Sequence, residues 1–232
     1  MQRVVDFLAA LCALIVLAPV LAGIALAIWI SDGSPILFRQ VRMGRDGRPF
    51  QILKFRTMRP NVSGGSITAA GDRRITRVGS WLRKFKLDEL PQFLNVLRGD
   101  MSLIGPRPEV PEYVEISRPI WREVLMVRPG ITDIATLAYR DEEFLLSCAA
   151  DSDVYYRTII LPEKLNLNVR YVRSRCIAAD VKLLWMTMHY SLRPSRFDRD
   201  RVLDMLPVVH EGPWHVFCTS TQMNPRSYSE EV

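Results

Sequence analysis

The chain has 232 residues and a mass of 26.6 kDa, enough for one ordinary domain. Its 48% hydrophobic and 24% charged content excludes a disordered or fibrous protein. The net charge of +6 is uneven, because residues 36–130 hold 18 basic and 9 acidic side chains while the two flanking segments are weakly negative. Four scattered cysteines without a CxxC pair argue against a disulfide scaffold, and three late histidines argue against a zinc site.

Residues 7–30 form an uncharged segment in which every residue except Pro19 and Gly23 is apolar. The segment is longer than the core of a secretory signal peptide, which has about 7 to 15 residues. It is long enough for one spanning helix, because about 20 apolar residues cross the hydrocarbon core. The basic residues that follow would then hold the C-terminal side of the segment in the cytoplasm.

Pro19 supports a second interpretation of this segment. Proline removes a backbone N–H and kinks or breaks a helix, and Gly23 lies one turn later. Two half-helices of about 12 residues could not each cross the bilayer, so the chain would re-enter on the same face. The freed carbonyl groups would need partners, and residues 7–30 contain no Ser or Thr to supply them. Composition alone therefore favours the spanning helix and leaves the re-entrant one open.

The polar body begins with a predicted β-hairpin. Residues 36–41 and 51–58 read as strands, and the sequence GRDGRP at 44–49 carries strong turn signals. Side chains alternate along a strand, so Lys54 and Arg56 would share one face, either as a solvated surface or as a phosphate clamp. Residues 61–72 are rich in Gly, Ser, Thr and Ala, which predicts a loop.

Helical patterns follow the loop. Apolar residues three or four apart predict one helix from residue 73 to about 85 and a second that begins near Pro91 and is closed by Gly99. Further along, residues 165–170 alternate like a strand, whereas residues 177–188 look helical. From residue 193 onward the composition suggests an appendage or a tail.

Asp88 and Glu89 are the first candidates for chemistry, since they would lie at the N-terminus of the second helix. Adjacent carboxylates at a helix start often only complement the helix dipole. Here Arg83 precedes them and Arg107 follows, and a helix start with several guanidinium groups suits an anionic phosphate ester. In such a field a carboxylate can serve as a nucleophile toward phosphorus or as a Mg²⁺ ligand.

Arg107 stands between two prolines in the sequence GPRP. The prolines keep their neighbours extended and Gly105 allows a close backbone approach, so the motif could aim one arginine; a Pro-rich bend with a solvated arginine is the alternative. The basic region does not read as a nucleic-acid interface, because aromatic residues are not interleaved with its charges and no DNA or RNA motif is visible. Beside a membrane segment, some of these cations would bind anionic lipid.

Four strings occur in a specific order: FRQVRMGRDGRPFQILKFRTM, LDELPQFLNVLRGDMSLIGPRPE, VRPGIT and YYRTIILPEKLNLNVRYV. Together they resemble the bacterial sugar transferase family, the monotopic polyprenyl-phosphate phosphoglycosyltransferases, over about residues 3–188, and specifically its small members. The resemblance implies an α+β, mainly helical fold. A re-entrant membrane helix would occupy residues 1–35, a cytosolic catalytic domain with a short β-hairpin residues 36–195, and a C-terminal tail of unknown role residues 196–232. It also assigns helix to the alternating segment 165–172.

The resemblance further implies an enzyme that moves a phosphosugar from a UDP-sugar to undecaprenyl phosphate and releases UMP, at the start of exopolysaccharide, O-antigen or glycoprotein glycan synthesis. Asp88 matches the family nucleophile, which forms a covalent phosphosugar intermediate, and Glu89 matches the residue that assists proton removal and the metal site. Mg²⁺ is the implied cofactor, with both carboxylates near it. The candidate phosphate- or donor-binding residues are Lys54, Arg56, Arg83 and Arg107.

The resemblance favours the re-entrant helix with its break at Pro19 and both ends in the cytoplasm, at the bacterial inner membrane. Expected partners are undecaprenyl phosphate, a UDP-sugar, membrane lipid and glycosyltransferases of the same pathway. Two departures from the family pattern are Ala18, where Ser is frequent, and Asp133-Ile134-Ala135-Thr136, which we expect to affect donor fit. The hypothesis from another class is a catalytically inactive, membrane-anchored scaffold of a glycan assembly complex.

Overall fold

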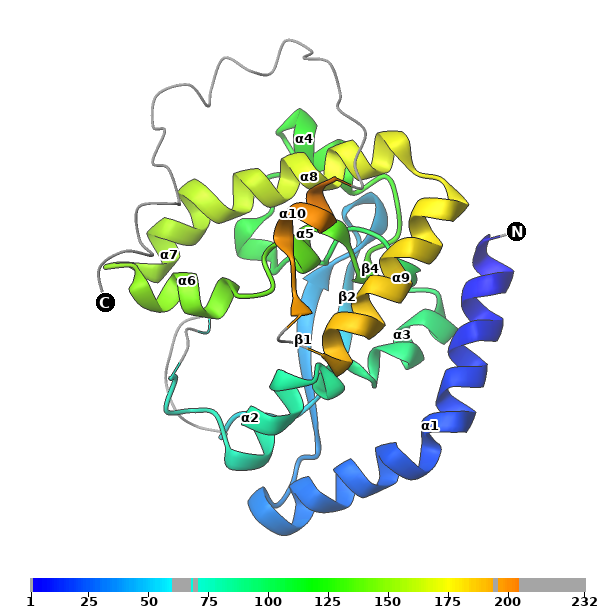
Figure 1. Cartoon of the computed structure of the whole chain (residues 1–232), viewed down its shortest axis with the longest axis vertical. Helices are drawn as coiled ribbons and strands as arrows, with labels where there is room; N and C mark the ends of the chain where they lie inside the picture. The colour runs from blue at the N-terminus through cyan, green and yellow to red at the C-terminus, as the bar shows by residue number, and fades with distance from the viewer. Residues whose placement is uncertain (1, 60–67, 69–70, 194–195, 205–232) are drawn as a thin grey trace.

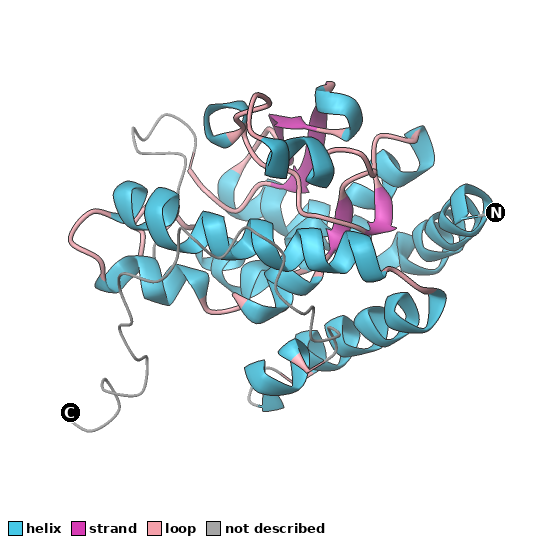
Figure 2. Ribbon diagram, turned by 90° about the horizontal axis from the view of Figure 1, so that it is seen from above, coloured by secondary structure: helices cyan, strands magenta, loops and turns pink. Residues whose placement is uncertain are grey.

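The computed structural model describes residues 2–59, 68, 71–193 and 196–204. It is mainly helical and contains two small two-stranded sheets, as the α+β prediction with a hairpin required. Figure 2 shows the strands close together with helices around them. The strands are β1 (Leu37–Met43), β2 (Pro49–Phe55), β3 (Ser102–Ile104) and β4 (Gly130–Thr132). The helices are α1 (Gln2–Asp32), α2 (Arg77–Lys84), α3 (Gln92–Arg98), α4 (Pro119–Val124), α5 (Ile134–Ala138), α6 (Glu142–Cys148), α7 (Ser152–Tyr155), α8 (Leu161–Ser174), α9 (Ile177–Leu192) and α10 (Arg199–Leu203).

Helix α1 contains the apolar segment and is continuous through Pro19. Figure 1 shows its ribbon bending partway along its length, and a proline inside a helix is a known cause of such a bend. Among the described residues it is the helix that is long and apolar enough to cross a membrane, by length and composition.

Both ends of α1 are attached to the body of the protein. Near its start, the Arg3 guanidinium donates to backbone carbonyls at the end of α3, and the Asp6 carboxylate accepts from the Ser102 hydroxyl at 2.9 Å. Near its end, Ile24 and Ile28 pack into a cluster with Phe55 and Leu82. No residue from 11 to 23 is buried, so the middle of the helix lies away from the body.

The predicted hairpin is present, with strand ends that differ from the prediction by a few residues. β1 and β2 are antiparallel, with Leu37 opposite Phe55 and Met43 opposite Pro49. β2 ends at Phe55, three residues before the predicted end, because Met58 instead forms a bridge with Ile75. The predicted loop at 61–72 lies mostly outside the described residues.

The two predicted helices before and after the acidic pair also form. α2 begins at Arg77 rather than at residue 73, because the Thr76 hydroxyl caps it by accepting from the Gly79 N–H at 2.9 Å. α3 begins directly after Pro91, as predicted. It ends at Gly99, whose φ of 94° is the left-handed conformation that glycine adopts without strain.

The three residues before GPRP and the last three of VRPGIT form a small parallel sheet that the sequence did not predict. β3 pairs with β4, with Ser102 opposite Gly130 and Ile104 opposite Thr132. A Cβ atom on Gly130 would lie 2.1 Å from the Gly105 nitrogen, so only glycines allow the two backbones to come this close. The close approach expected at Gly105 is therefore confirmed, and it anchors the base of the GPRP loop.

The main core is formed by the C-terminal half of the chain. The alternating segment at 165–170 is helical, within α8, because Leu161, Leu165 and Val169 recur four residues apart and are all buried in this core. The described part of the predicted tail contains α10, whose Val202 is fully buried in the same core. Residues 205–232 of that predicted tail lie outside the described residues.

Candidate active site

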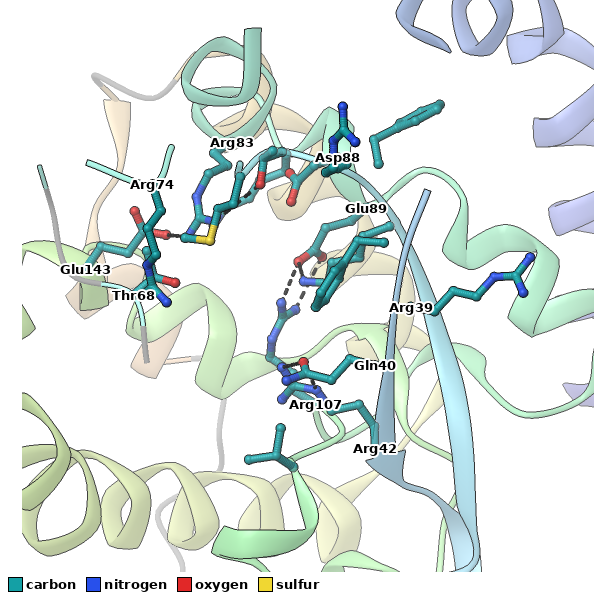
Figure 3. Close-up of a pocket in the computed structure, with 18 of the residues that line it drawn as sticks. Arg39, Gln40, Arg42, Thr68, Arg74, Arg83, Asp88, Glu89, Arg107 and Glu143 are labelled. Carbon is teal, nitrogen blue, oxygen red and sulfur yellow. Dashed lines mark hydrogen bonds and ion pairs between the residues drawn. The ribbon is translucent and has the colours of Figure 1, made fainter. Parts of the chain in front are cut away.

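A cavity of about 650 Å³ opens between the hairpin, the segment joining α2 to α3, the GPRP loop, α6 and α8. Its described lining includes ten basic and five acidic side chains, so it suits an anionic ligand. All the candidate site residues line it: Lys54, Arg56, Arg83, Asp88, Glu89 and Arg107. Figure 3 labels the last four of them. The structure thus brings together residues that span more than 50 positions of sequence.

A sharp turn places the acidic pair. Lys86 adopts a left-handed conformation with φ of 57°, which is uncommon for a residue with a side chain. Asp88 and Glu89 follow in the short 3₁₀ turn Leu87–Glu89 rather than within α3 itself. Leu87 and Leu90 pack against the cluster that contains Phe55 and Leu82, which orients the turn. Both carboxylates are buried as a result.

Glu89 is held between two cations. Its Oε1 lies 2.8 Å from the Lys54 Nζ and 2.5 Å from the Arg107 Nη2, and the Arg107 Nη1 is 3.3 Å from Oε2. Burial opposes ionisation, but Arg107 and Lys54 outweigh it and hold the pKa of Glu89 well below its ordinary value. Burial would also lower the pKa of Arg107, yet the pairing with Glu89 raises it. Glu89 is therefore ionised at neutral pH, and both of its oxygens are engaged.

Asp88 has the opposite environment. It is 7% exposed, and its Oδ1 has no hydrogen-bond partner among the residues that the structure describes. Burial, followed by the neighbouring Glu89 charge, raises the pKa of Asp88 above its ordinary value despite the attraction of Lys54 and Lys86. Two adjacent carboxyl groups whose environments drive their pKa values apart are suited to different chemical roles. Asp88 is the one with a buried oxygen that has no hydrogen-bond partner among the described residues.

The residues present fit a divalent cation only in a limited way. In the described part of the chain, no group of three or more His, Cys, Asp or Glu side chains could hold a metal ion. The unpartnered, buried Asp88 Oδ1 is a suitable ligand atom, whereas the Glu89 oxygens already pair with Lys54 and Arg107. Magnesium commonly takes one or two carboxylates and completes its shell with substrate phosphates and water, and Asp88 meets that requirement.

Arg107 is positioned by Asp133, which the sequence singled out only as a departure from the family pattern. The fully buried Asp133 carboxylate accepts the Arg107 backbone N–H at 2.8 Å and the Thr136 N–H at 2.5 Å. It therefore caps the start of α5 and fixes the backbone of the GPRP loop together.

The two remaining candidates are committed to other contacts. Arg83 pairs with Glu143 of α6 across the cavity, with 2.5 Å between Nη2 and Oε1 (Figure 3). Arg56 lies just beyond β2 and donates from Nη2 to the carbonyls of Asp32 and Gly33, each at 2.8 Å. Its Nε and Nη1 are buried without a partner among the described residues.

Sequence reasoning missed the far side of the cavity. Glu109, Glu142, Tyr156 and Lys164 line it together with Arg42. Glu109 closes the string GPRPE and Lys164 lies in the string LPEKL, so the motifs contained them, but nothing in their spacing indicated that they would meet.

The geometry of a cation-lined cavity with a divided acidic pair agrees with the comparisons with known proteins. The family model described as bacterial sugar transferase matches residues 1–194. The chain belongs to the bacterial sugar transferase family.

Several relatives have assigned names. The chain is 34% identical over 194 residues to the UDP-glucose:undecaprenyl-phosphate glucose-1-phosphate transferase of Escherichia coli, covering 81% of this chain and 39% of that protein. It is 38% identical over 194 residues to the UDP-N-acetylgalactosamine-undecaprenyl-phosphate N-acetylgalactosaminephosphotransferase of Aeromonas hydrophila, covering 81% of this chain and 42% of that protein. The exopolysaccharide production protein PSS of Rhizobium leguminosarum bv. phaseoli is 38% identical over 170 residues, covering 67% of this chain and 84% of that protein. The chain thus spans less than half the length of the first two.

Proposed function

We propose that this protein transfers a phosphosugar from a UDP-sugar to undecaprenyl phosphate, with Asp88 as the nucleophile, and so begins the assembly of a bacterial surface glycan. The observation that carries the proposal is the division of labour in the acidic pair: Glu89 is clamped by Lys54 and Arg107, while Asp88 keeps an unpartnered oxygen in a cation-lined cavity. The relatives named as undecaprenyl-phosphate sugar phosphotransferases support the same substrate classes.

The first step is an in-line displacement at the phosphorus that carries the sugar. An Asp88 carboxylate oxygen forms a bond to this phosphorus, the bond from phosphorus to the bridging oxygen breaks, and UMP leaves with that electron pair. Arg107 and Lys54 orient Glu89 and place positive charge next to the phosphoryl group. Arg56 lines the same cavity and adds to the positive charge that would face the phosphoryl oxygens.

In the second step an oxygen of the lipid phosphate attacks the same phosphorus. The bond from phosphorus to the Asp88 oxygen breaks, and the carboxylate is regenerated as the lipid diphosphate sugar forms. Glu89 lines the same cavity as Asp88, and the family resemblance assigns to it the assistance of proton removal from the lipid phosphate. A bound Mg²⁺, with Asp88 and the substrate phosphates as its nearest oxygen ligands, would supply charge neutralisation of the diphosphate.

The membrane association in this proposal is the re-entrant one. The docked ends of α1 hold it on the body at Arg3 and Asp6 and again at Ile24 and Ile28, and the exposed apolar middle of the helix is the part that lipid would cover. The bend of α1 agrees with a chain that enters and leaves one face of the bilayer. The catalytic domain would then lie on the cytoplasmic side, where glycosyltransferases of the same pathway would take up the product.

The proposal is tested by UMP release from a panel of UDP-sugars with undecaprenyl phosphate and Mg²⁺ in detergent. We expect at least one donor to be turned over, and Asp88→Asn to abolish turnover. The matched control is Asp46→Asn, at an exposed turn residue whose left-handed conformation asparagine also tolerates. With donor alone, mass spectrometry should find the phosphosugar mass on the peptide that contains Asp88. Near wild-type release by Asp88→Asn would remove Asp88 as the nucleophile.

The scaffold hypothesis gives different outcomes. A catalytically inactive anchor would release no UMP from any donor, would leave glycan output normal after Asp88→Ala, and would lose output when α1 is deleted.

The membrane topology has its own test. In a variant without the native cysteines, a cysteine placed at Gln2 should be shielded from external thiol reagents in intact cells. Labelling of this cysteine from outside the cell would instead support a spanning helix.

A further inference from the structure

The cavity has a second polar surface that the proposed chemistry does not use. We call it the Glu109 wall, and define it by Arg42, Glu109, Glu142, Tyr156 and Lys164. Its residues come from β1, the GPRPE loop, α6, a π-helical turn at Tyr156–Ile160 and α8. In Figure 3, Arg107 lies between Glu89 and Arg42, so the wall continues the cavity beyond the clamp on Glu89.

The members of the Glu109 wall fix one another. The Tyr156 hydroxyl donates to the Glu109 Oε1 at 2.8 Å, and the Lys164 Nζ lies 2.8 Å from the Glu142 Oε2 and 3.9 Å from the Glu109 Oε1. Burial would lower the pKa of Lys164, but Glu142 and Glu109 raise it, so the amine stays charged. The wall is therefore a pre-organised set of charged and phenolic groups.

The backbone around Tyr156 has an unusual conformation that positions its side chain. Pro162 has no N–H to donate to the preceding turn, and the chain accommodates it with the π-helical turn. Such turns are rare and occur frequently at functional sites. Here the turn carries Tyr156 into the cavity, where its hydroxyl meets Glu109.

The charge balance distinguishes the two ends of the cavity. Near Asp88 and Glu89 lie five cations, Lys54, Arg56, Arg83, Lys86 and Arg107, against three carboxylates including Glu143, and the excess of positive charge suits a diphosphate. The Glu109 wall has two cations and two carboxylates, so its formal charge is zero and it offers nothing to an additional phosphate. A carboxylate offers about four acceptor positions and a lysine about three donors, more than the internal contacts use. This inventory suits an uncharged ligand with several hydroxyl groups.

We infer that the Glu109 wall binds the hexose ring of the donor, an assignment that rests on the proposed function. The hexose stays attached to phosphorus through both displacements, whereas UMP must leave and carries a phosphate that needs cations. The retained, uncharged part of the donor therefore matches the buried, neutral wall, where the side chains of Lys164 and Glu109 are only 6% and 10% exposed. Hydroxyl groups would donate to Glu109 and Glu142 and accept from Lys164.

The test compares the preferred UDP-hexose with its single-deoxy analogues in the wild type, Glu142→Gln and Tyr156→Phe. For at least one hydroxyl, its removal should lower the wild-type kcat/KM about tenfold or more, because a hydrogen bond to a charged partner is lost. The same removal should cost one of the variants less than about threefold, since Glu142→Gln removes the charge of an acceptor and Tyr156→Phe removes the hydroxyl that holds the acceptor Glu109 in place. Glu163→Gln, on the same helix as Lys164 but outside the cavity, is the matched control and should keep the wild-type pattern.

Inhibition by UMP tells whether the wall contacts the hexose or the ribose of the donor, because UMP contains the ribose but not the hexose. The inhibition constant of UMP should stay within about twofold of the wild-type value in both variants. A parallel loss of UMP affinity would place the ribose at the wall and overturn the assignment. Equal deoxygenation penalties in the wild type and both variants would also overturn it. Failure of the wild type to release UMP from any donor would instead refute the proposed function.

Discussion

Replacing Arg107 with lysine removes one half of a two-pronged contact and leaves the charge in place. Arg107 reaches both oxygens of Glu89, with Nη2 at 2.5 Å from Oε1 and Nη1 at 3.3 Å from Oε2. A lysine ammonium is a point charge that can contact one oxygen well but cannot reproduce the fork. Lys54 still holds Oε1 in this variant, so Glu89 is not left as an isolated buried charge.

The size of the effect follows from the contact that is lost. One hydrogen bond between charged partners contributes about 1.5–3 kcal/mol. Both side chains are mostly buried, at 23% and 11% exposed, so solvent screening does not reduce this much. If the clamp on Glu89 acts in the transition state, kcat/KM for the UDP-sugar should fall about 10- to 150-fold in Arg107→Lys.

The assay is UMP release at saturating lipid phosphate, run beside thermal unfolding of the same samples. Arg98→Lys, at an exposed position of α3, is the control and should retain the wild-type kcat/KM. A loss below about threefold in Arg107→Lys, without a change in melting temperature, would refute the argument that the bidentate contact serves catalysis.

Three further predictions concern the acidic residues. Because the folded state raises the pKa of Asp88, the ionised side chain lowers the stability of the protein above that pKa. Asp88→Asn should therefore raise the melting temperature at pH 7 in EDTA, by about 2–4 °C for each kcal/mol of stability gained. A melting temperature below that of the wild type would contradict this. Glu89 has a depressed pKa, so its contribution to stability is complete above the ordinary pKa of 4.5 and is lost as the pH falls through the folded-state pKa. In Glu89→Gln, the free energy of unfolding measured with denaturant should therefore fall less between pH 7 and pH 3 than in the wild type. The same pH dependence in both proteins would count against the clamp on Glu89. Asp133→Asn turns one acceptor into a donor that faces a backbone N–H, so the free energy of unfolding should fall by about 1–3 kcal/mol. The kcat/KM should fall as well, because Asp133 holds the backbone of Arg107. An unchanged kcat/KM would limit Asp133 to capping α5.

Local signals explain which parts of this fold were predictable. The start of α3 at Pro91 and its end at Gly99 are determined by residues within a few positions of each boundary, and both were predicted. The sheet of β3 and β4 was not predicted, since three-residue strands have no periodicity to detect. The start of α2 was misplaced because the apolar spacing continues through Ile75, which forms a bridge with Met58 instead of joining the helix.

The same distinction applies to the site. The candidates from Lys54 to Arg107 lie in compact, charge-rich motifs, and all of them line the cavity. The motifs could not reveal that Glu89, rather than Asp88, receives the cations, because that choice depends on how the hairpin and the GPRP loop approach the turn in the tertiary fold. The Glu109 wall was missed for a related reason: Arg42 and Lys164 are brought together only by the tertiary fold.

Helix α1 and the cavity are connected through the end of β2. Lys54, within the strand, holds Glu89, and Arg56, two residues later, holds the carbonyls at the end of α1 while also lining the cavity. A strand segment this short leaves little freedom between the two contacts, because successive residues advance only about 3.3 Å. Under the proposed function, the depth at which α1 sits in lipid therefore sets the height of Asp88 and Glu89 above the membrane surface. The lipid chain of the acceptor holds its phosphate at the same surface. A site attached rigidly to α1 would therefore reach that phosphate without a further conformational change.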